Sequence, residues 1–565
     1  MSQYKSQDAG RLKDNPVRWD READIVVVGT GAAGSSATLF SHESGAQIVV
    51  LEKAGRYGGT TEKSGGIFHA PNNSFMLAAG IKDERDDAIR YYARLAYPTL
   101  YNPKDSRFGL SEHQYSLIAA YYDNASAAVD GLARMGALKA TPWMEFDGKR
   151  FFPDYYAHLP ENKAPRGRGL LPKDPGTGKG IMSGFELIRQ LKAAVDKRGI
   201  PVLLNHRASR LVTNSKGEII GIEAVAEGKK TIAIRARKGV IFGSGGFTQN
   251  PEMRLNYLRG PVYGGCAVPT NQGDFVYLAT AVGAKLANMN HAWWAQAVLE
   301  EVLQNPSTPT DIFAVPGDSM IQVNKYGRRV MSEKFVYNER TQVHFDWDPV
   351  KSEYKNLFLF MIYDQRTADI WGPSSGLLGA YPIPRAGTPA ALHVITGQTL
   401  EDLADAISAR LATLTDRTGN FRLDTSFVAN FRETVSRFNQ YAESGVDLEF
   451  HRGETPIELA FHGPAARGNN KPNPTMYPLS STGPYYAIIL SGGTLDTKGG
   501  PKINSRSQVL TTEEQPIPGL YGAGNCIGSP AGQAYWAGGG TIGPALTFGY
   551  VAAVNATKEP VKEDK

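Results

Sequence analysis

The chain has 565 residues, and 61 lysines and arginines against 56 aspartates and glutamates leave a formal net charge of +5. This charge is mild for the length, and no basic run is interleaved with aromatic residues, so we expect no nucleic-acid partner. The two cysteines, Cys266 and Cys526, lie far apart without CxxC spacing. This argues against a disulfide framework or a metal site and favours a reducing, cytoplasmic compartment.

The sequence shows no export or membrane-spanning signal. Residues 1–19 are polar and charged and lack the apolar centre of a signal peptide. The longest apolar runs, such as residues 357–363, are far shorter than the roughly 20 residues that a membrane span needs. We therefore expect a cytoplasmic protein and leave peripheral membrane contact open.

The first predicted elements form a β-turn-α-β unit after a polar arm at residues 1–22. Residues 24–28 are a continuous apolar run followed by glycines, which is typical of a buried parallel strand entering a tight turn. Residues 32–41 are compatible with a helix, and residues 47–51 form a second strand that ends at Glu52. This order predicts a mononucleotide-binding unit.

The turn carries the fingerprint Gly29-Thr30-Gly31-Ala32-Ala33-Gly34. The first glycine makes the turn, the second lets the backbone approach a pyrophosphate, and the third allows close packing of the helix on the strand. Amide groups at the helix N-terminus face the phosphates. Glu52, at the end of the second strand, is placed to accept a hydrogen bond from a ribose hydroxyl.

The remaining elements follow in chain order. Residues 58–66 are a polar glycine loop, and residues 85–140 are mainly amphipathic helix. A helix at 185–197 is followed by a strand at 202–204, a strand-turn-strand segment at 210–226 with its turn at 215–217, and a strand at 238–242. Mixed helix and strand at 286–475, a strand at 517–521 and a helix at 543–556 complete the chain.

These patterns predict an α/β fold, with a Rossmann-like FAD-binding domain in two segments and an inserted α+β substrate domain. The segments are 23–285 and 476–565, and the inserted domain is 286–475. FAD is favoured over NAD because Gly243-Ser244-Gly245-Gly246 and Gly522-Ala523-Gly524-Asn525 resemble the outer parts of a flavoprotein nucleotide domain. No second GxGxxG occurs, so we expect an external electron acceptor, quinone-like or a carrier protein, in place of NAD(P)H.

The residues expected to contact FAD come from all of these glycine-rich segments and from the last helix. They are Gly29, Gly31, Ala32, Ala33, Gly34, Glu52, Lys53, Gly59, Thr60, Thr61, Ser64, Gly65, Gly66, Ala208, Gly245, Gly246, Gly524, Asn525, Thr541 and Ile542. The 58–66 loop has no histidine where histidyl-linked flavoproteins carry one, so we expect non-covalent FAD.

The fingerprint, the 58–66 loop and the ending at 519–525 resemble the fumarate reductase and ketosteroid dehydrogenase flavoproteins. Residues 541–550 more specifically resemble the 3-ketosteroid Δ1-dehydrogenases. This resemblance implies FAD-dependent dehydrogenation of a 3-ketosteroid, or a similar polycyclic ketone, with a new double bond at C1–C2.

The resemblance also implies a role for four residues. In that family a tyrosine and a glycine four residues later hold the C3 carbonyl, and here these are Tyr535 and Gly539. A second tyrosine acts as the base and matches Tyr337. A third supports the base, and residues 152–156 supply Tyr155 as the first choice and Tyr156 as the second.

These residue types suit the implied chemistry. A hydrogen α to a ketone is acidic because the enolate charge rests on oxygen, and donors at that oxygen stabilise the charge. A base removes the α proton while flavin N5 accepts hydride from the β carbon. A free tyrosine has a pKa near 10, so Tyr337 needs a tuned environment.

Two departures from the family pattern leave alternatives open. Trp536-Ala537 follows Tyr535 where the family has Pro-Gly, and residues 372–393 form an expected extra loop. The alternatives are C4–C5 dehydrogenation or enone reduction on the same scaffold, and a flavin carrier without its own substrate. A fumarate-type reductase is disfavoured, because no arginine follows position 506 to clamp a dicarboxylate.

Overall fold

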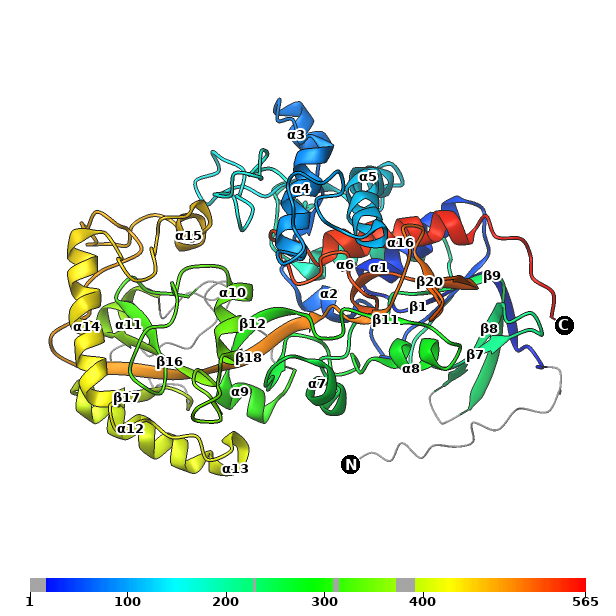
Figure 1. Ribbon diagram of the computed structural model, residues 1–565. Helices are drawn as coiled ribbons and strands as arrows, with labels where there is room; N and C mark the ends of the chain where they lie inside the picture. Colours follow the sequence, from blue (N-terminus) through cyan, green and yellow to red (C-terminus); the bar gives the residue numbers. More distant parts are fainter. Residues whose placement is uncertain (1–16, 227–229, 308–314, 372–391, 565) are drawn as a thin grey trace.

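The structure is a computed structural model, in which residues 17–226, 230–307, 315–371 and 392–564 are described. Most of the expected 372–393 loop, and residues 1–16 of the expected arm, lie outside the described residues. Within the described ranges, no helix combines the length and apolar character that a membrane crossing requires. Figure 1 shows two large sheets side by side, joined by long segments that pass between them.

The first sheet has eight strands and carries the opening mononucleotide-binding unit. Its order is β20 (Gln508–Leu510), β21 (Pro516–Gly522), β9 (Thr231–Phe242), β1 (Arg21–Val28), β2 (Ile48–Leu51) and β6 (Val202–Leu203), with β8 (Ile219–Val225) on β9 and β7 (Arg207–Thr213) on β8. β21, β9, β1, β2 and β6 run parallel. The central strands β1 and β2 contain buried apolar runs, Ile25–Val28 and Ile48–Leu51, as is typical of parallel strands that helices cover.

Helices surround this sheet and bring the two ends of the chain together. They are α1 (Ala32–Glu43), α2 (Gly59–Lys63), α3 (Ser74–Ala78), α4 (Arg85–Ala96), α5 (Glu112–Arg134), α6 (Gly184–Lys197), α8 (Asp274–Thr280) and α16 (Ile542–Ala556). Figure 1 shows α16 beside α1 and α5. Phe40 of α1 and Tyr550 of α16 lie with ring centroids 4.5 Å apart.

The helical stretch expected at 85–140 is divided into α4 and α5. α4 ends where Pro98 follows Tyr97, because proline disfavours the helical conformation of the residue before it. α5 begins at a capping box in which Ser111 and Gln114 exchange hydrogen bonds. β1 also begins earlier than expected, at Arg21, since Arg21 and Glu22 pair with β9.

The second sheet has six strands and forms the other half of the molecule. Its order is β10 (Gly264–Gly265), β18 (Tyr485–Thr497), β16 (Phe358–Asp364) and β13 (Met320–Val323), with β12 (Ala292–Val298) and β17 (Ile395–Gly397) also on β18. β10 and β18 lie outside the 286–475 range. The second sheet therefore includes residues on both sides of the predicted inserted domain. The domain division at 285 and 475 stays a prediction.

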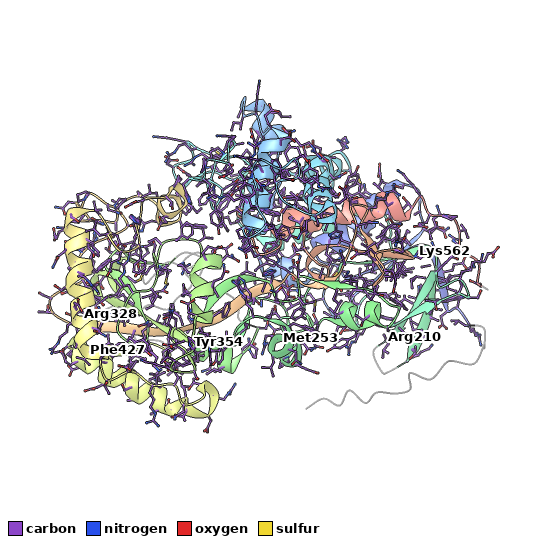
Figure 2. The ribbon with its side chains drawn as sticks, in the orientation of Figure 1. Arg210, Met253, Arg328, Tyr354, Phe427 and Lys562 are labelled. Atoms are coloured by element: carbon purple, nitrogen blue, oxygen red, sulfur yellow. The ribbon has the colours of Figure 1, made fainter. Side chains whose placement is uncertain are left out.

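Helices and small sheets complete the fold. The helices are α7 (Pro251–Tyr257), α9 (Leu299–Gln304), α10 (Tyr337–Gln342), α11 (Gln365–Trp371), α12 (Leu400–Thr413), α13 (Thr415–Thr418), α14 (Phe427–Ser444) and α15 (Pro456–His462). The small sheets pair β3 (Phe68–His69) and β4 (Ala140–Pro142) with β5 (Gly169–Pro172), β11 (Leu286–Ala287) with β19 (Gly500–Pro501), and β14 (Trp347–Asp348) with β15 (Glu353–Tyr354). Figure 2 shows Phe427 and Arg328 at one end of the molecule and Lys562 at the other.

Candidate active site

A single cavity receives segments from both sheets and from the last helix. Every predicted catalytic residue lines it, as does every predicted FAD-contacting residue except Gly34 and Gly246. Further lining residues, which the sequence did not single out, include Thr30, Lys63, Ile67, Trp143, Met182, His206, Cys266, Asn271, Phe461, Leu495 and Asp496. Residues more than 500 positions apart therefore meet in one place.

The glycine turn is closed by backbone contacts that leave no room for side chains. A Cβ on Gly34 would lie 1.9 Å from the carbonyl oxygen of Gly29, and a Cβ on Gly29 would lie 2.4 Å from that of Gly243. Gly34 thus serves the packing of α1 on β1 and Gly29 the turn, while Gly31 faces the cavity.

The carboxylate of Glu52, which follows β2, is hydrogen-bonded to this turn. Its Oε2 accepts hydrogen bonds from Thr30 N at 3.1 Å and Thr30 Oγ1 at 2.6 Å, and its Oε1 accepts one from Ala54 N at 2.8 Å. Glu52 is buried and lines the cavity. Its carboxylate is therefore held rigidly, with remaining acceptor capacity on each oxygen.

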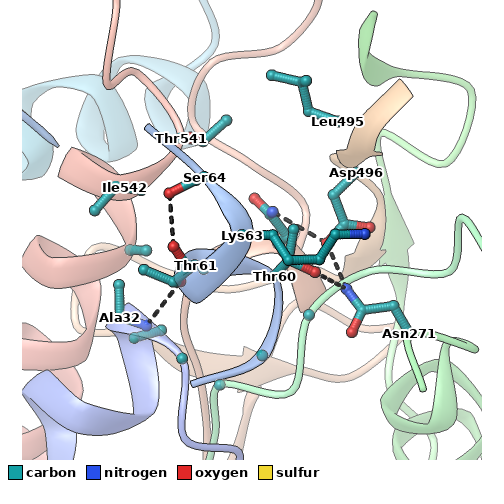
Figure 3. Close-up of a pocket in the computed structure, with 18 of the residues that line it drawn as sticks. Ala32, Thr60, Thr61, Lys63, Ser64, Asn271, Leu495, Asp496, Thr541 and Ile542 are labelled. Carbon is teal, nitrogen blue, oxygen red and sulfur yellow. Dashed lines mark hydrogen bonds between the residues drawn. The ribbon is translucent and has the colours of Figure 1, made fainter. Parts of the chain in front are cut away.

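The loop before and within α2 forms one wall of the cavity (Figure 3). Thr61 Oγ1 accepts from Ala32 N, the first amide of α1, at 3.1 Å. Thr60 Oγ1 accepts from Asn271 Nδ2 at 3.2 Å. The loop is thus tied to α1 on one side and to the segment before α8 on the other.

Asp496, at the end of β18, binds three distant segments around the cavity. Its Oδ2 accepts from Asn271 Nδ2 at 2.8 Å, Gly246 N at 2.9 Å and Asn525 Nδ2 at 3.1 Å. A single aspartate after a strand carries no sequence motif, so the sequence offered no signal for this residue. The contacts explain why Gly246 supports the site without lining it.

The three tyrosines predicted to be catalytic converge in the cavity. The hydroxyls of Tyr155 and Tyr337 are 2.5 Å apart. The ring of Tyr535 lies 5.2 Å from that of Tyr155 and 5.4 Å from that of Tyr337, centroid to centroid. Tyr156, the second choice, instead hydrogen-bonds Glu339 and is absent from the cavity lining.

The tyrosines are buried, which favours their neutral form. Burial raises the pKa of Tyr155 and Tyr337 well above the ordinary value, and neighbouring phenols add to this effect for Tyr337. Burial also raises the pKa of Tyr535, although the hydroxyls of Tyr337, Thr541 and Tyr155 oppose the shift. Tyr535 is therefore a hydrogen-bond donor at neutral pH.

Buried charges hold the segment that leads to Tyr337. Glu333 accepts hydrogen bonds from Arg329 at 2.7 and 2.9 Å, and Arg329 also pairs with Asp447 at 2.7 Å. Glu333 and Arg329 are almost fully buried. Arg329, in the turn Gly327-Arg328-Arg329, thus helps to position α10, and with it Tyr337, through a paired network.

Trp536 and Ala537 stand in the loop between Tyr535 and Gly539. The indole of Trp536 is fully buried, 4.6 Å from the ring of Tyr92. Its carbonyl accepts from Tyr91 Oη at 2.8 Å and from Tyr155 N at 3.0 Å. The residue that departs from the family pattern therefore links the backbones of two site tyrosines.

Gly539 adopts a conformation that other residues avoid. Its φ is +83°, and a Cβ would lie 2.7 Å from His69 N. Its carbonyl accepts from His69 N at 3.2 Å and Gly543 N at 2.8 Å. No acceptor for its own N–H occurs among the described residues. This amide is thus available to a ligand carbonyl.

The remaining wall near the tyrosines is apolar. Trp143, Phe461, Met182, Ile67 and Leu495 line it, and Phe461 lies 5.8 Å from the ring of Tyr155. Within the described part of the chain, no arginine lines the cavity. The site therefore suits an apolar ketone and lacks the guanidinium groups that clamp a dicarboxylate.

A protein-family model described as an FAD binding domain matches residues 24–542. The 3-oxosteroid 1-dehydrogenase of Mycolicibacterium smegmatis is 32% identical over 95% of this chain and 97% of that protein. This chain belongs to the FAD-dependent 3-oxosteroid 1-dehydrogenase family. The predicted family, flavoprotein fold and FAD cofactor are confirmed.

Two further proteins resemble this chain over nearly its whole length. The 4-oxocyclohexanecarboxylate 2-dehydrogenase of Sinomonas cyclohexanicum is 29% identical over 94% of this chain and 92% of that protein. The 3-ketosteroid delta1-dehydrogenase of Sterolibacterium denitrificans, solved with 1,4-androstadiene-3,17-dione, has 27% identity and a TM-score of 0.78. That match covers 95% of this chain and 99% of the solved one.

The cavity residues of this 3-oxosteroid 1-dehydrogenase family member fit FAD. The glycine turn, which excludes side chains, and the N-terminal end of α1 suit the pyrophosphate, and Glu52 suits a ribose. Asn525 and Thr541 line the same cavity as Tyr535. When bound, FAD supplies a hydride acceptor, and the surrounding residues orient the substrate toward it.

Proposed function

We propose that this chain dehydrogenates a 3-ketosteroid at C1–C2 with FAD as the oxidant. One observation carries the proposal: Tyr155, Tyr337 and Tyr535 converge beside Gly539 in the cavity that fits FAD. Confirmed membership of the 3-oxosteroid 1-dehydrogenase family supports the same chemistry.

Each site residue has a distinct task in this proposal. The Tyr535 hydroxyl and Gly539 N–H donate to the C3 carbonyl oxygen and stabilise the charge of the developing enolate. Tyr337 takes the proton from the α carbon. Tyr337 acts in its deprotonated form, and the hydroxyl of Tyr155, 2.5 Å away, donates a hydrogen bond to it, which stabilises the phenolate and keeps the base aligned. The apolar wall holds the ring system and excludes water.

Electrons leave through a separate acceptor in this proposal. The sequence has no second GxGxxG fingerprint for NAD(P)H. A quinone-like molecule or a carrier protein is the class of oxidant that remains. Non-covalent attachment of FAD and peripheral membrane contact stay predictions.

Anaerobic titration of the flavin absorbance tests the substrate class. The panel is a 3-keto-4-ene steroid, its saturated 5α and 5β analogues, 4-oxocyclohexanecarboxylate and succinate. We expect the 3-keto-4-ene steroid to bleach the flavin and to gain a C1–C2 double bond, identified by mass and NMR spectra of the product.

The other outcomes assign the alternatives. Bleaching by a saturated steroid with a new C4–C5 double bond would indicate Δ4 chemistry. Bleaching by 4-oxocyclohexanecarboxylate alone would move the substrate to small cyclic ketones. Bleaching by no ketone would refute the proposal and leave only the FAD assignment.

A further inference from the structure

Lys498 is a fully buried lysine that the proposed chemistry does not use. It follows β18 directly, and its side chain is 0% exposed. It forms no ion pair with any acidic side chain in the described part of the chain. Lysines are almost never fully buried without a partner, because desolvation of the ammonium group is costly. Burial lowers the pKa of Lys498 well below its ordinary value.

The amine of Lys498 contacts the residue before Tyr535. Its Nζ donates a hydrogen bond to the carbonyl oxygen of Ala534 at 2.5 Å. The backbone of Lys498 is itself fixed, since its N–H donates to His291 O and its carbonyl accepts from Ser529 N, each at 3.0 Å. A rigid strand end thus holds the start of the loop that carries Tyr535.

The same amine lies against Trp293, which contacts the Tyr535 ring. Lys498 Nζ is 4.1 Å from the Trp293 ring centroid. Trp293 packs against Tyr535 with centroids 4.9 Å apart and an interplanar angle of 64°. Trp293 Nε1 also donates to Asn525 Oδ1, a predicted FAD contact, at 3.0 Å. Lys498 therefore restrains both the backbone next to Tyr535 and, through Trp293, the ring of Tyr535.

We propose that Lys498 is a positioning residue, which aligns the Tyr535 hydroxyl with the substrate carbonyl relative to FAD. This inference rests on the proposed role of Tyr535 as the carbonyl donor. Lys498 does not line the cavity, so it acts through Ala534 and Trp293. Its burial is then explained by the alignment of the Tyr535 hydroxyl.

A double-mutant cycle with Tyr535→Phe tests this role in the FAD-loaded protein. Lys498→Met keeps the length of the side chain and removes the donor, and we expect kcat to fall roughly 10- to 100-fold, the effect of a misplaced reacting group. In the Tyr535→Phe background, the same change should have almost no further effect, because the hydroxyl to be aligned is gone. Equal losses in both backgrounds would overturn the proposal.

A second readout and a matched control separate alignment from folding. We expect the Kd of a 3-keto-1,4-diene steroid, measured from perturbation of the flavin spectrum, to rise in Lys498→Met and in Tyr535→Phe alike. Lys562→Met is the control, because Lys562 is also a buried lysine that donates to a backbone carbonyl, that of Lys238. Its kcat and steroid Kd should stay unchanged. An unchanged Kd in Lys498→Met would contradict the proposal.

Two further arrangements keep the test decisive. If Lys498→Met does not fold, Trp293→Phe should give the same non-additivity with Tyr535→Phe, and simple additivity there would count against it. If the wild-type protein oxidises another ketone of the panel in place of a steroid, the proposed substrate fails. The cycle is then run with that ketone, and its outcome judges Lys498 separately.

Discussion

The three site tyrosines share one environment but need opposite protonation behaviour. Burial raises the pKa of all three phenols. A neutral phenol is what Tyr535 needs as a donor, whereas Tyr337 must lose or pass on its proton to act as a base. The 2.5 Å contact lets the Tyr155 hydroxyl donate a hydrogen bond to Tyr337 and so stabilise its deprotonated form.

Removal of either hydroxyl should slow the reaction without loss of cofactor. We expect Tyr535→Phe and Tyr337→Phe each to lower turnover by roughly 10²-fold or more, the scale of a positioned acid–base group. Steady-state rates with the reactive ketone and the FAD-to-protein absorbance ratio measure the two quantities. A near-normal rate in either variant would remove that residue from the mechanism.

The pH dependence of the rate should report the raised pKa of the Tyr155–Tyr337 pair. The active base is the deprotonated form, and a raised pKa leaves less of it at neutral pH. We therefore expect kcat/KM to rise by up to tenfold per pH unit, with no plateau below about pH 10. The rise should be absent in Tyr337→Phe, and a plateau near pH 7 in the wild type would be inconsistent with this base.

At the scale of elements, α1 is held against β1 at a distance that only glycine permits. The hydrogen-bonded loop of α2 then covers the N-terminus of α1, since Thr61 accepts from Ala32 N at 3.1 Å. The second feature joins residues 29 positions apart, whereas the first depends on residues within a few positions of the turn. This is why the turn was accessible to sequence analysis.

A methyl group at Gly34 should push α1 away from β1. We expect Gly34→Ala to lower FAD occupancy and the Tm together, because its Cβ would lie 1.9 Å from Gly29 O. Gly45→Ala, just beyond the same helix, is the control. Its φ of +82° costs about 1 kcal/mol, but no atom lies within 4 Å of the added Cβ. Full FAD occupancy in Gly34→Ala, measured by absorbance after gel filtration, would disprove this packing argument.

At the scale of the whole molecule, β18 connects the two sheets to one site. It pairs with β10, β12, β16 and β17 in the second sheet. Its last residues then reach the cavity, where Asp496 binds Gly246 and Asn525, which flank strands of the first sheet. Figure 1 shows β18 crossing from one half of the molecule toward the other.

Loss of the Asp496 carboxylate should weaken the assembly as a whole. We expect Asp496→Asn to leave donors such as Gly246 N and Asn271 Nδ2 poorly paired, at about 1–3 kcal/mol for each lost buried acceptor. FAD should dissociate more readily and the Tm should fall. Thermal unfolding with and without added FAD measures this, with the exposed Asp405→Asn on α12 as a control. Unchanged FAD retention would show that Asp496 is dispensable for the site.

Local chemistry let the sequence by itself determine the opening βαβ unit, the glycine turn with Glu52, the FAD cofactor and the class of fold. The unit and the turn depend on contiguous residues whose spacing is set by backbone geometry, and the choice of FAD depends on further short glycine motifs at 243–246 and 522–525. The tyrosines were located through a family resemblance, and no composition or periodicity distinguishes three phenols among 26.

Only the tertiary structure decided which distant side chains meet. It brought Tyr155, Tyr337 and Tyr535 together and excluded Tyr156 from the cavity. It also showed contacts of Asp496, Trp293 and Lys498 that no sequence motif predicts. β18, from near residue 490, likewise paired with β12 and β16, which come much earlier in the chain. The physical reason is that strand pairing and burial act between segments hundreds of residues apart, and neither leaves a local pattern along the chain.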